Sequence, residues 1–292
     1  MKSALAINVE YALLRGTCAL VNAIPYRVAC ALAKGMAWAA VRVFRFQRRR
    51  TISRIASVFP EKSQAELLGL AVASFENVLL TGLEMMRAPS FDREWIDRHV
   101  EDVPKYKAEL QRLVDEGKGV VVMVPHTGNW YMAAWALAKY GLPLFAIAAR
   151  QRNPKLNAWM ERQYGDIEVL DRDCRDTLSR IRQKLNAGGV FAILPDLRVR
   201  KQDVAAPFLR GTANVSRAGA LFATKTGAPI VVAAMRRERG RHVFAHLATL
   251  RTEGRSAEDL TREALSLLSD FILKHPEQWF WYNKRWILEP VS

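Results

Sequence analysis

A histidine followed by a glycine and an asparagine stands where a strand is expected to end. His126 comes two residues after the apolar run 119–124, and Gly128 and Asn129 follow it. Imidazole titrates near neutral pH, so a histidine exposed in such a turn is suited to act as a general base. Glycine lets a substrate approach the backbone, and the asparagine amide could fix the ring or donate to an oxyanion. A histidine that only completes a hydrogen-bond network is the structural alternative.

Charged residues follow two other apolar runs. Asp196 and Arg198 come after the run 190–194, and Arg150 ends the run 143–149. Asp196 could orient the His126 ring, bind substrate, or only cap a turn. The two arginines could hold a phosphate through paired N–H donors, or they could belong to a solvated basic face.

Three further groups of residues have weaker signals. His242 and His246 would share one face of a strand but lie too far apart for an easy shared metal ion, so no metal site is expected. No cofactor is expected either. The aromatic stretch 277–282 is interpreted as a plug in the core or a membrane-facing belt. Lys284 and Arg285, which follow it, could contact phosphates.

Alternating strands and helices must position these residues. Short apolar runs rich in β-branched residues indicate strands that are buried on both faces. Expected strands are 119–124, 143–149, 167–170, 190–194 and 229–235, and expected helices are 129–140, 154–164, 173–187, 214–226 and 256–274. This alternation predicts an α/β domain with a mainly parallel sheet and flanking helices. Ligands of such sheets gather at the carboxyl ends of the strands, where His126 and Asp196 would meet.

Other elements complete the prediction. Ser63 and Glu66 form a capping box that opens a helix extending beyond residue 80, and a helix over 104–116 ends at Gly117. A strand over 242–250 has no helix before it, so we expect it to be antiparallel and to lie at an edge of the sheet.

The N-terminal part of the chain is both apolar and basic. The chain has 292 residues and a formal charge of +15, and residues 1–54 hold ten basic residues but one acidic residue. This composition suits an anionic membrane surface. Its longest uncharged run has eleven residues, 16–26, which is short of the roughly 20 needed to span a bilayer, so we expect it to lie in the interface. We therefore divide the chain into a membrane-associating segment, 1–54, and an α/β domain, 55–292.

The composition also excludes several classes of protein. Half of the residues are hydrophobic, which excludes general disorder. Three scattered cysteines are too few for a disulfide framework or a zinc cage, and they favour a reducing compartment. The aromatic residues of the basic segment lie among aliphatic ones, so nucleic acid is not an expected partner.

Ordered motifs along nearly the whole chain resemble those of the bacterial lipid A biosynthesis acyltransferases, the late lauroyl/myristoyl transferase family that includes phosphatidylinositol mannoside acyltransferases. Each motif alone is weak, but their order and spacing are specific. The matching motifs are residues 54–61, Glu84, 126–130, 153–154, 194–196, 207–211, 226–229 and 276–286.

The resemblance implies a glycerolipid acyltransferase-like fold and a membrane enzyme on the cytoplasmic face of the inner membrane. Such an enzyme transfers a fatty acyl group from acyl carrier protein or acyl-CoA to a hydroxyl of a glycolipid, such as a lipid A precursor, without a cofactor. Its chemistry rests on a His-x4-acid pair, in which the histidine deprotonates the acceptor. His126 matches the histidine, but Tyr131 occupies the position of the acid.

Tyr131 leaves alternatives for the catalytic machinery. A phenol can accept a hydrogen bond but supplies no fixed negative charge to an imidazolium ion. Asp196 could orient His126 instead, or a reactive thioester could need no such acid. An inactive relative that binds lipid or carrier protein is the competing interpretation, and a phosphatidylinositol mannoside-type lipid is the alternative acceptor.

Overall fold

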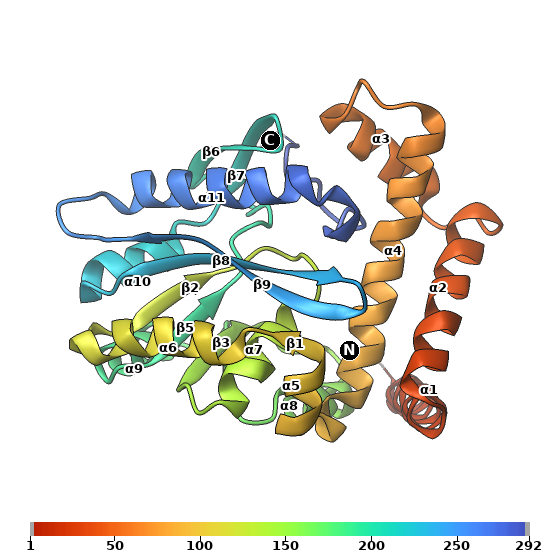
Figure 1. Cartoon of the computed structure of the whole chain (residues 1–292), viewed down its shortest axis with the longest axis horizontal. Helices are drawn as coiled ribbons and strands as arrows, with labels where there is room; N and C mark the ends of the chain where they lie inside the picture. Colours follow the sequence, from red (N-terminus) through yellow and green to blue (C-terminus); the bar gives the residue numbers. More distant parts are fainter. Residues whose placement is uncertain (1–2, 290–292) are drawn as a thin grey trace.

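The computed structural model describes residues 3–289, which form a seven-stranded sheet with helices packed around it (Figure 1). The sheet order is β1-β9-β8-β2-β5-β3-β4, and every neighbouring pair is parallel except β8 and β9. The strands are β1 (Val100–Glu101), β2 (Val120–Met123), β3 (Leu144–Ala148), β4 (Glu168–Asp171), β5 (Val190–Ile193), β8 (Ile230–Glu238) and β9 (Arg241–Leu250). The predicted α/β class with a mainly parallel sheet is confirmed.

The central strand β2 shows why the sheet needs helices on both faces. All four of its residues are buried. Val121 and Met123 belong to one hydrophobic cluster, whereas Val120 and Val122 belong to another on the opposite face. The helices of the domain are α5 (Arg93–His99), α6 (Val103–Leu113), α7 (Trp130–Lys139), α8 (Pro154–Tyr164), α9 (Thr177–Asn186), α10 (Ala218–Thr226) and α11 (Ala257–Lys274).

Two predictions from the sequence are corrected here. The helix expected over 214–226 begins at Ala218, because β6 (Val204–Phe208) and β7 (Gly211–Val215) form an antiparallel hairpin before it. The alternating burial of β6 is the period-2 pattern of a strand. The strand β9 is antiparallel to β8 as predicted, but the two-residue β1 covers its other side, so β9 is not at the edge of the sheet.

The long helix α4 (Gln64–Arg87) runs along one end of the sheet (Figure 1). The predicted capping box of Ser63 and Glu66 opens it. The C-terminal segment packs against this helix: the Ser74 hydroxyl donates to the Trp279 carbonyl at 2.6 Å, and the Tyr282 hydroxyl donates to the Ala71 carbonyl at 2.8 Å. The aromatic stretch 277–282 is therefore a plug in the core, one of the two interpretations of the sequence.

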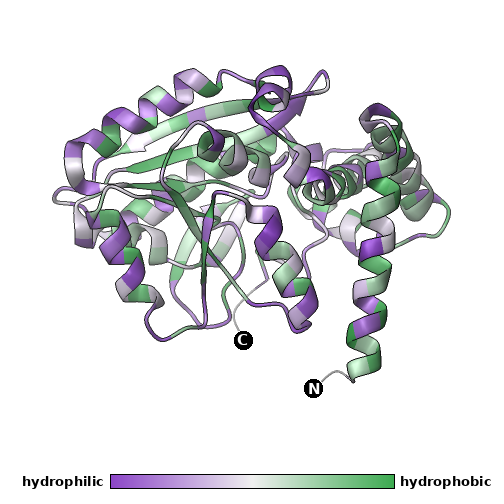
Figure 2. Ribbon diagram, turned by 90° about the horizontal axis from the view of Figure 1, so that it is seen from below, coloured by the Kyte–Doolittle hydropathy of each residue, from purple (hydrophilic) through white to green (hydrophobic). Residues whose placement is uncertain are grey.

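The helices α1 (Ala4–Ala23) and α2 (Tyr26–Arg42) lie on the far side of α4 from the sheet (Figure 1). The helix α1 lies at one end of the molecule and has no buried residue (Figure 2). It still contacts the rest of the protein, because the Asn153 amide donates to the Ile7 carbonyl at 3.0 Å and Tyr11 and Leu14 pack against one of the hydrophobic clusters. Its 20 residues are long and apolar enough to cross a membrane by length and composition. The helical stretch Gln64–Ser90, which contains α4, also qualifies, but 39% of it is buried inside the protein.

The helix α3 (Arg48–Val58) contains residue 54, where we divided the chain. Ile55 and Val58 lie in the main hydrophobic cluster. The Arg54 guanidinium donates to the carbonyl of Trp281 at 3.1 Å and lies over the Trp286 ring, 5.3 Å from its centroid. The part of the chain from α3 onward is thus joined to the C-terminal segment.

Candidate active site

His126 and Asp196 meet at the carboxyl end of neighbouring strands, as the sequence predicted. The imidazole Nδ1 lies 2.7 Å from one oxygen of the Asp196 carboxylate. The other oxygen accepts the backbone N–H of His126 at 2.7 Å and the indole N–H of Trp279 at 2.9 Å. Of the three possible roles for Asp196, the geometry favours orientation of the ring.

The Asp196 carboxylate is held in its charged form. Asp196 is fully buried, and burial by itself would raise its pKa. The positive charge of a protonated His126 and the hydrogen bonds from His126 and Trp279 outweigh burial, so the pKa of Asp196 lies below its ordinary value. Because Nδ1 faces this carboxylate, it carries the proton and leaves Nε2 as the free base. The His126 side chain is 15% exposed, which gives a substrate access to the ring.

Contacts of Gly128 hold the turn that follows His126 in place. Gly128 adopts φ +53°, and a Cβ there would lie 2.5 Å from the Met235 carbonyl oxygen, so only glycine fits. The Gly128 carbonyl accepts hydrogen bonds from the side chains of Asn77 at 2.9 Å and Thr81 at 3.1 Å, both on α4. Its N–H donates to the Gln278 carbonyl at 3.2 Å. The helix α4 and the C-terminal segment therefore fix this turn together.

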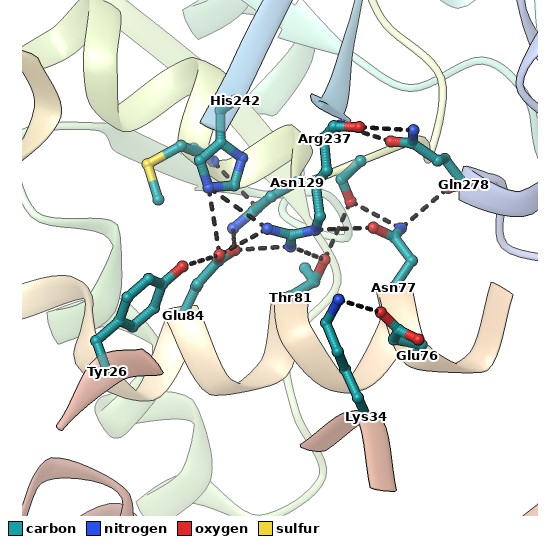
Figure 3. Close-up of polar contacts among 12 residues, drawn as sticks. Tyr26, Lys34, Glu76, Asn77, Thr81, Glu84, Asn129, Arg237, His242 and Gln278 are labelled. Atoms are coloured by element: carbon teal, nitrogen blue, oxygen red, sulfur yellow. Dashed lines mark hydrogen bonds and ion pairs between the residues drawn. The ribbon is translucent and has the colours of Figure 1, made fainter. Parts of the chain in front are cut away.

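Asn129 does not contact the imidazole ring or an oxyanion site. It is fully buried, and its side-chain oxygen caps α7 by accepting the N–H of Met132 at 3.1 Å. Its amide N–H donates to the Glu84 carboxylate at 2.6 Å (Figure 3). Asn129 therefore acts on the His126 turn by anchoring the start of α7 to α4.

Glu84 lies at the centre of a buried polar cluster (Figure 3). The two terminal nitrogens of the Arg237 guanidinium, Nη1 and Nη2, donate to the two carboxylate oxygens of Glu84 at 2.6 and 2.7 Å. The Tyr26 hydroxyl donates at 2.7 Å, and the Nε2 atom of His242 lies 3.2 Å away. Burial alone would raise the pKa of Glu84, but Arg237 and His242 hold it well below its ordinary value. The cluster joins α2, α4, β8 and β9 at one carboxylate.

The Tyr131 side chain packs in a group of aromatic rings, beside Trp130 at 5.4 Å. Its ring lies 5.7 Å from that of Trp135 and 6.4 Å from that of Tyr164, both nearly parallel to it. Burial raises the pKa of its phenol. No hydrogen bond joins its side chain to His126 within residues 3–289, so the structure gives Asp196 the position beside the ring.

The four basic residues considered for substrate binding lie apart. Arg150 is exposed and pairs with Asp171 at 3.0 Å, on the β3–β4 side of the sheet. Arg198 lies in the loop after Asp196, where its guanidinium donates to the Glu289 carbonyl at 2.9 Å. Lys284 and Arg285 follow the aromatic plug in the C-terminal segment. The structure places none of them in the His126–Asp196–Trp279 group.

An apolar cavity of about 290 Å³ opens beside His126. Pro125 and Trp130, which flank His126 in the chain, form part of its wall, and the Trp130 ring lies 4.8 Å from the imidazole. Side chains of α6, α7 and the sheet provide the rest, including Leu110 and Ala134. Small and aliphatic walls of this kind fit a hydrocarbon chain.

Sequence reasoning did not identify two residues of this region. Trp279 was placed in a plug, but its indole N–H also donates to the Asp196 carboxylate. Arg237 had no signal, because it lies between two expected strands, where an arginine is usually solvated. His242 and His246 do not form a shared site: His242 binds Glu84, and His246 lies near Thr249.

Known proteins are similar to this chain over most of its length. The phosphatidylinositol mannoside acyltransferase of Mycolicibacterium smegmatis is 24% identical over 254 residues, covering 83% of this chain and 80% of that protein. A phosphatidylinositol mannoside acyltransferase of Mycobacterium tuberculosis is 21% identical over 249 residues, covering 83% and 77%. The model of the bacterial lipid A biosynthesis acyltransferase family matches residues 3–287, essentially the whole described structure. The chain therefore belongs to the bacterial lipid A biosynthesis acyltransferase family.

Proposed function

We propose that this chain transfers a fatty acyl group from a thioester donor, acyl carrier protein or acyl-CoA, to a hydroxyl of a glycolipid such as a lipid A precursor. The observation that carries the proposal is the His126–Asp196 pair next to an apolar cavity whose wall includes Pro125 and Trp130. The pair can activate a hydroxyl, and the cavity can hold the acyl chain whose carbonyl is attacked.

The proposed reaction uses His126 as base and then as acid. The Nε2 atom takes the proton of the acceptor hydroxyl while the hydroxyl oxygen attacks the thioester carbonyl. The tetrahedral intermediate then collapses: the C–S bond breaks, the ester forms, and the imidazolium returns its proton to the leaving thiolate. Asp196 holds the ring and stabilises the imidazolium, which is the function that the family assigns to the acid at the position of Tyr131.

The proposal places the enzyme on the cytoplasmic face of the inner membrane. The apolar helix α1 and the surplus of basic residues in the first 54 positions support binding to an anionic bilayer. A net charge of +15 favours an acidic carrier protein as donor. Arg150, Arg198, Lys284 and Arg285 remain proposed contacts for phosphates of the acceptor. The names of the relatives support a phosphatidylinositol mannoside-type lipid as the second candidate acceptor.

The test is acyl transfer by the full-length protein in neutral detergent, with both donors offered to each candidate acceptor. We expect transfer that His126→Ala abolishes, whereas His275→Ala, a change at the end of α11, leaves it intact. Transfer that survives His126→Ala undiminished would refute the mechanism. If the wild-type protein binds lipid but transfers nothing from either donor, the chain is the inactive relative instead.

A further inference from the structure

A second hollow, of about 990 Å³, lies on the other side of the Glu84 cluster from His126. It lies between α2, α4, α5 and the turn that joins β8 to β9, and we call it the α2–hairpin pocket. Glu84 and Arg237 line it, whereas His126, Asp196 and Trp279 do not. It is therefore separate from the proposed site of acyl transfer.

The α2–hairpin pocket has a surplus of positive charge. Six cationic side chains and three carboxylates line it. The cations are Arg27, Lys34, Arg98, Arg237, Arg239 and Arg241, and the carboxylates are Glu76, Glu84 and Glu277.

Ion pairs use several of these charges but not all of them. Lys34 pairs with Glu76 at 2.9 Å, and Arg241 pairs with Glu101 at 3.3 Å. Arg27 and Arg239 form no ion pair within the described part of the chain, although they approach the pocket from different elements. Two guanidinium groups are therefore available to an anion.

The backbone at Arg239 is unusual. Arg239 has φ +49° and is followed by Gly240 at φ +81°, a turn in which asparagine or aspartate normally precedes the glycine. Placing an arginine in the left-handed region is unfavourable, and such strain is concentrated at functional positions. Here it places a long cation at the rim of the pocket.

One lining residue of the pocket, His242, has a buried polar atom without a partner among the described residues. The His242 side chain is 3% exposed, and its Nε2 lies beside Glu84. Its Nδ1 is buried and has no hydrogen-bond partner within residues 3–289. Buried polar atoms without partners are rare, and they often mark a site that a ligand or water completes.

The helix α2 indicates which kind of anion the pocket binds. Arg27 and Lys34 line the pocket, and beside them on the helix surface Val28, Leu32 and Met36 are 47%, 55% and 64% exposed. A basic row beside an apolar row suits a lipid, whose headgroup and chains need these two surfaces together. A free phosphate ion has no apolar part that could pack against the apolar row.

We propose that the α2–hairpin pocket binds the phosphate headgroup of an anionic membrane lipid whose chains lie along Val28, Leu32 and Met36. This site binds lipid without reaction and is independent of the proposed acyl transfer.

The test is binding of a short-chain, dispersed phosphatidylglycerol to the full-length protein in neutral detergent, measured by titration calorimetry. The variant Arg27→Gln/Arg239→Gly removes both available cations, and glycine suits the backbone at 239, so folding is preserved. We expect at least a tenfold weaker affinity. The control Arg49→Gln/Arg175→Gln removes the same charge from exposed positions outside the pocket, and we expect less than a twofold change.

Two further probes identify the ligand. We expect the corresponding phosphatidylcholine and inorganic phosphate each to bind at least tenfold more weakly than phosphatidylglycerol. If the control variant loses as much affinity for phosphatidylglycerol as the pocket variant, the attraction is general electrostatics and the proposal is overturned. An unchanged affinity in the pocket variant would overturn it as well. Inorganic phosphate that binds as tightly as the lipid would overturn the assignment to a lipid. Loss of acyl transfer in His126→Ala has no bearing on these measurements.

Discussion

Replacing Asp196 by asparagine should leave His126 unable to act as a base, without changing the shape of the proposed active site. One carboxylate oxygen accepts two N–H donors, from the His126 backbone and from Trp279, so the asparagine oxygen must take this position. The asparagine NH₂ group then faces Nδ1, which lies 2.7 Å from the carboxylate in the native protein. Nδ1 must lose its proton to accept this hydrogen bond, and the proton moves to Nε2.

The size of the effect follows from this change of tautomer. With a proton on Nε2, His126 cannot accept one from the acceptor hydroxyl. In serine proteases the corresponding change lowers kcat about 10⁴-fold, or about 5.5 kcal/mol in the barrier. We expect a loss of this order for Asp196→Asn. The KM for the acceptor should change little, because Asp196 is fully buried and its two oxygens are used by His126 and Trp279.

Single-turnover acyl transfer from a labelled thioester measures this loss directly. Asp166→Asn is the matched control, because this carboxylate pairs with Lys139 on the surface, and its rate should stay within about twofold. The pKa of Asp196 lies below its ordinary value, so its contribution to stability is present above about pH 4 and is lost as pH falls through the folded-state pKa. Thermal unfolding of Asp196→Asn should lack that acid-dependent part. A rate for Asp196→Asn within tenfold of wild type would refute the assignment of Asp196 as the orienting acid.

Four further changes test other parts of the structure. Tyr131→Phe should keep the transfer rate within about threefold, because the Tyr131 side chain packs among aromatic rings and forms no hydrogen bond with His126 within residues 3–289. For the same reason Tyr131→Glu should not raise the transfer rate, and a gain in rate would contradict this placement. Glu84→Gln should lower the free energy of unfolding, measured in urea, by about 3–5 kcal/mol, because it leaves the buried Arg237 guanidinium without its charged partner. The control Glu94→Gln, at an exposed ion pair, should change this free energy by less than about 1 kcal/mol. Deletion of residues 4–20 should weaken flotation with anionic vesicles, because it removes most of the apolar helix α1; flotation equal to the full chain would place the membrane contact elsewhere. Ala134→Phe should shift the preferred acyl donor to a shorter chain by filling the cavity beside His126, which competition between donors of different length measures.

Much of the α/β architecture could be predicted because its strands are short, continuous apolar runs. The positions of His126 and Asp196 at one edge of the sheet followed from the parallel order of those strands. The hairpin over 204–215 could not be recognised in this way, because the exposed positions of β6 are the apolar residues Ala205 and Pro207 and its turn uses Leu209 and Arg210 at positive φ, residues that seldom mark a turn.

The roles of individual polar residues were harder to predict. Asn129 has the same position after His126 whether it caps a helix or serves catalysis, and its buried partner Glu84 lies 45 residues away in the chain. The choice between Tyr131 and Asp196 also depended on tertiary structure: a histidine five residues before Tyr131, in the turn that precedes the helix, can face that residue or turn away from it. Arg237 became recognisable only when α4 brought a carboxylate to it.

The packing of α4 against the C-terminal segment has a consequence for the order of events during synthesis. Contacts that fix the His126 turn and its surroundings join residues more than 200 positions apart, including Asn77 with Gln278 and Ser74 with Trp279. The helices α1 and α2 leave the ribosome early and are able to meet a membrane while most of the chain is still unmade. The indole N–H that supports Asp196, in contrast, arrives with the last residues. Under the proposed function, a nascent chain can therefore reach the membrane long before it becomes competent for catalysis, so premature termination would yield a membrane-bound but inactive protein.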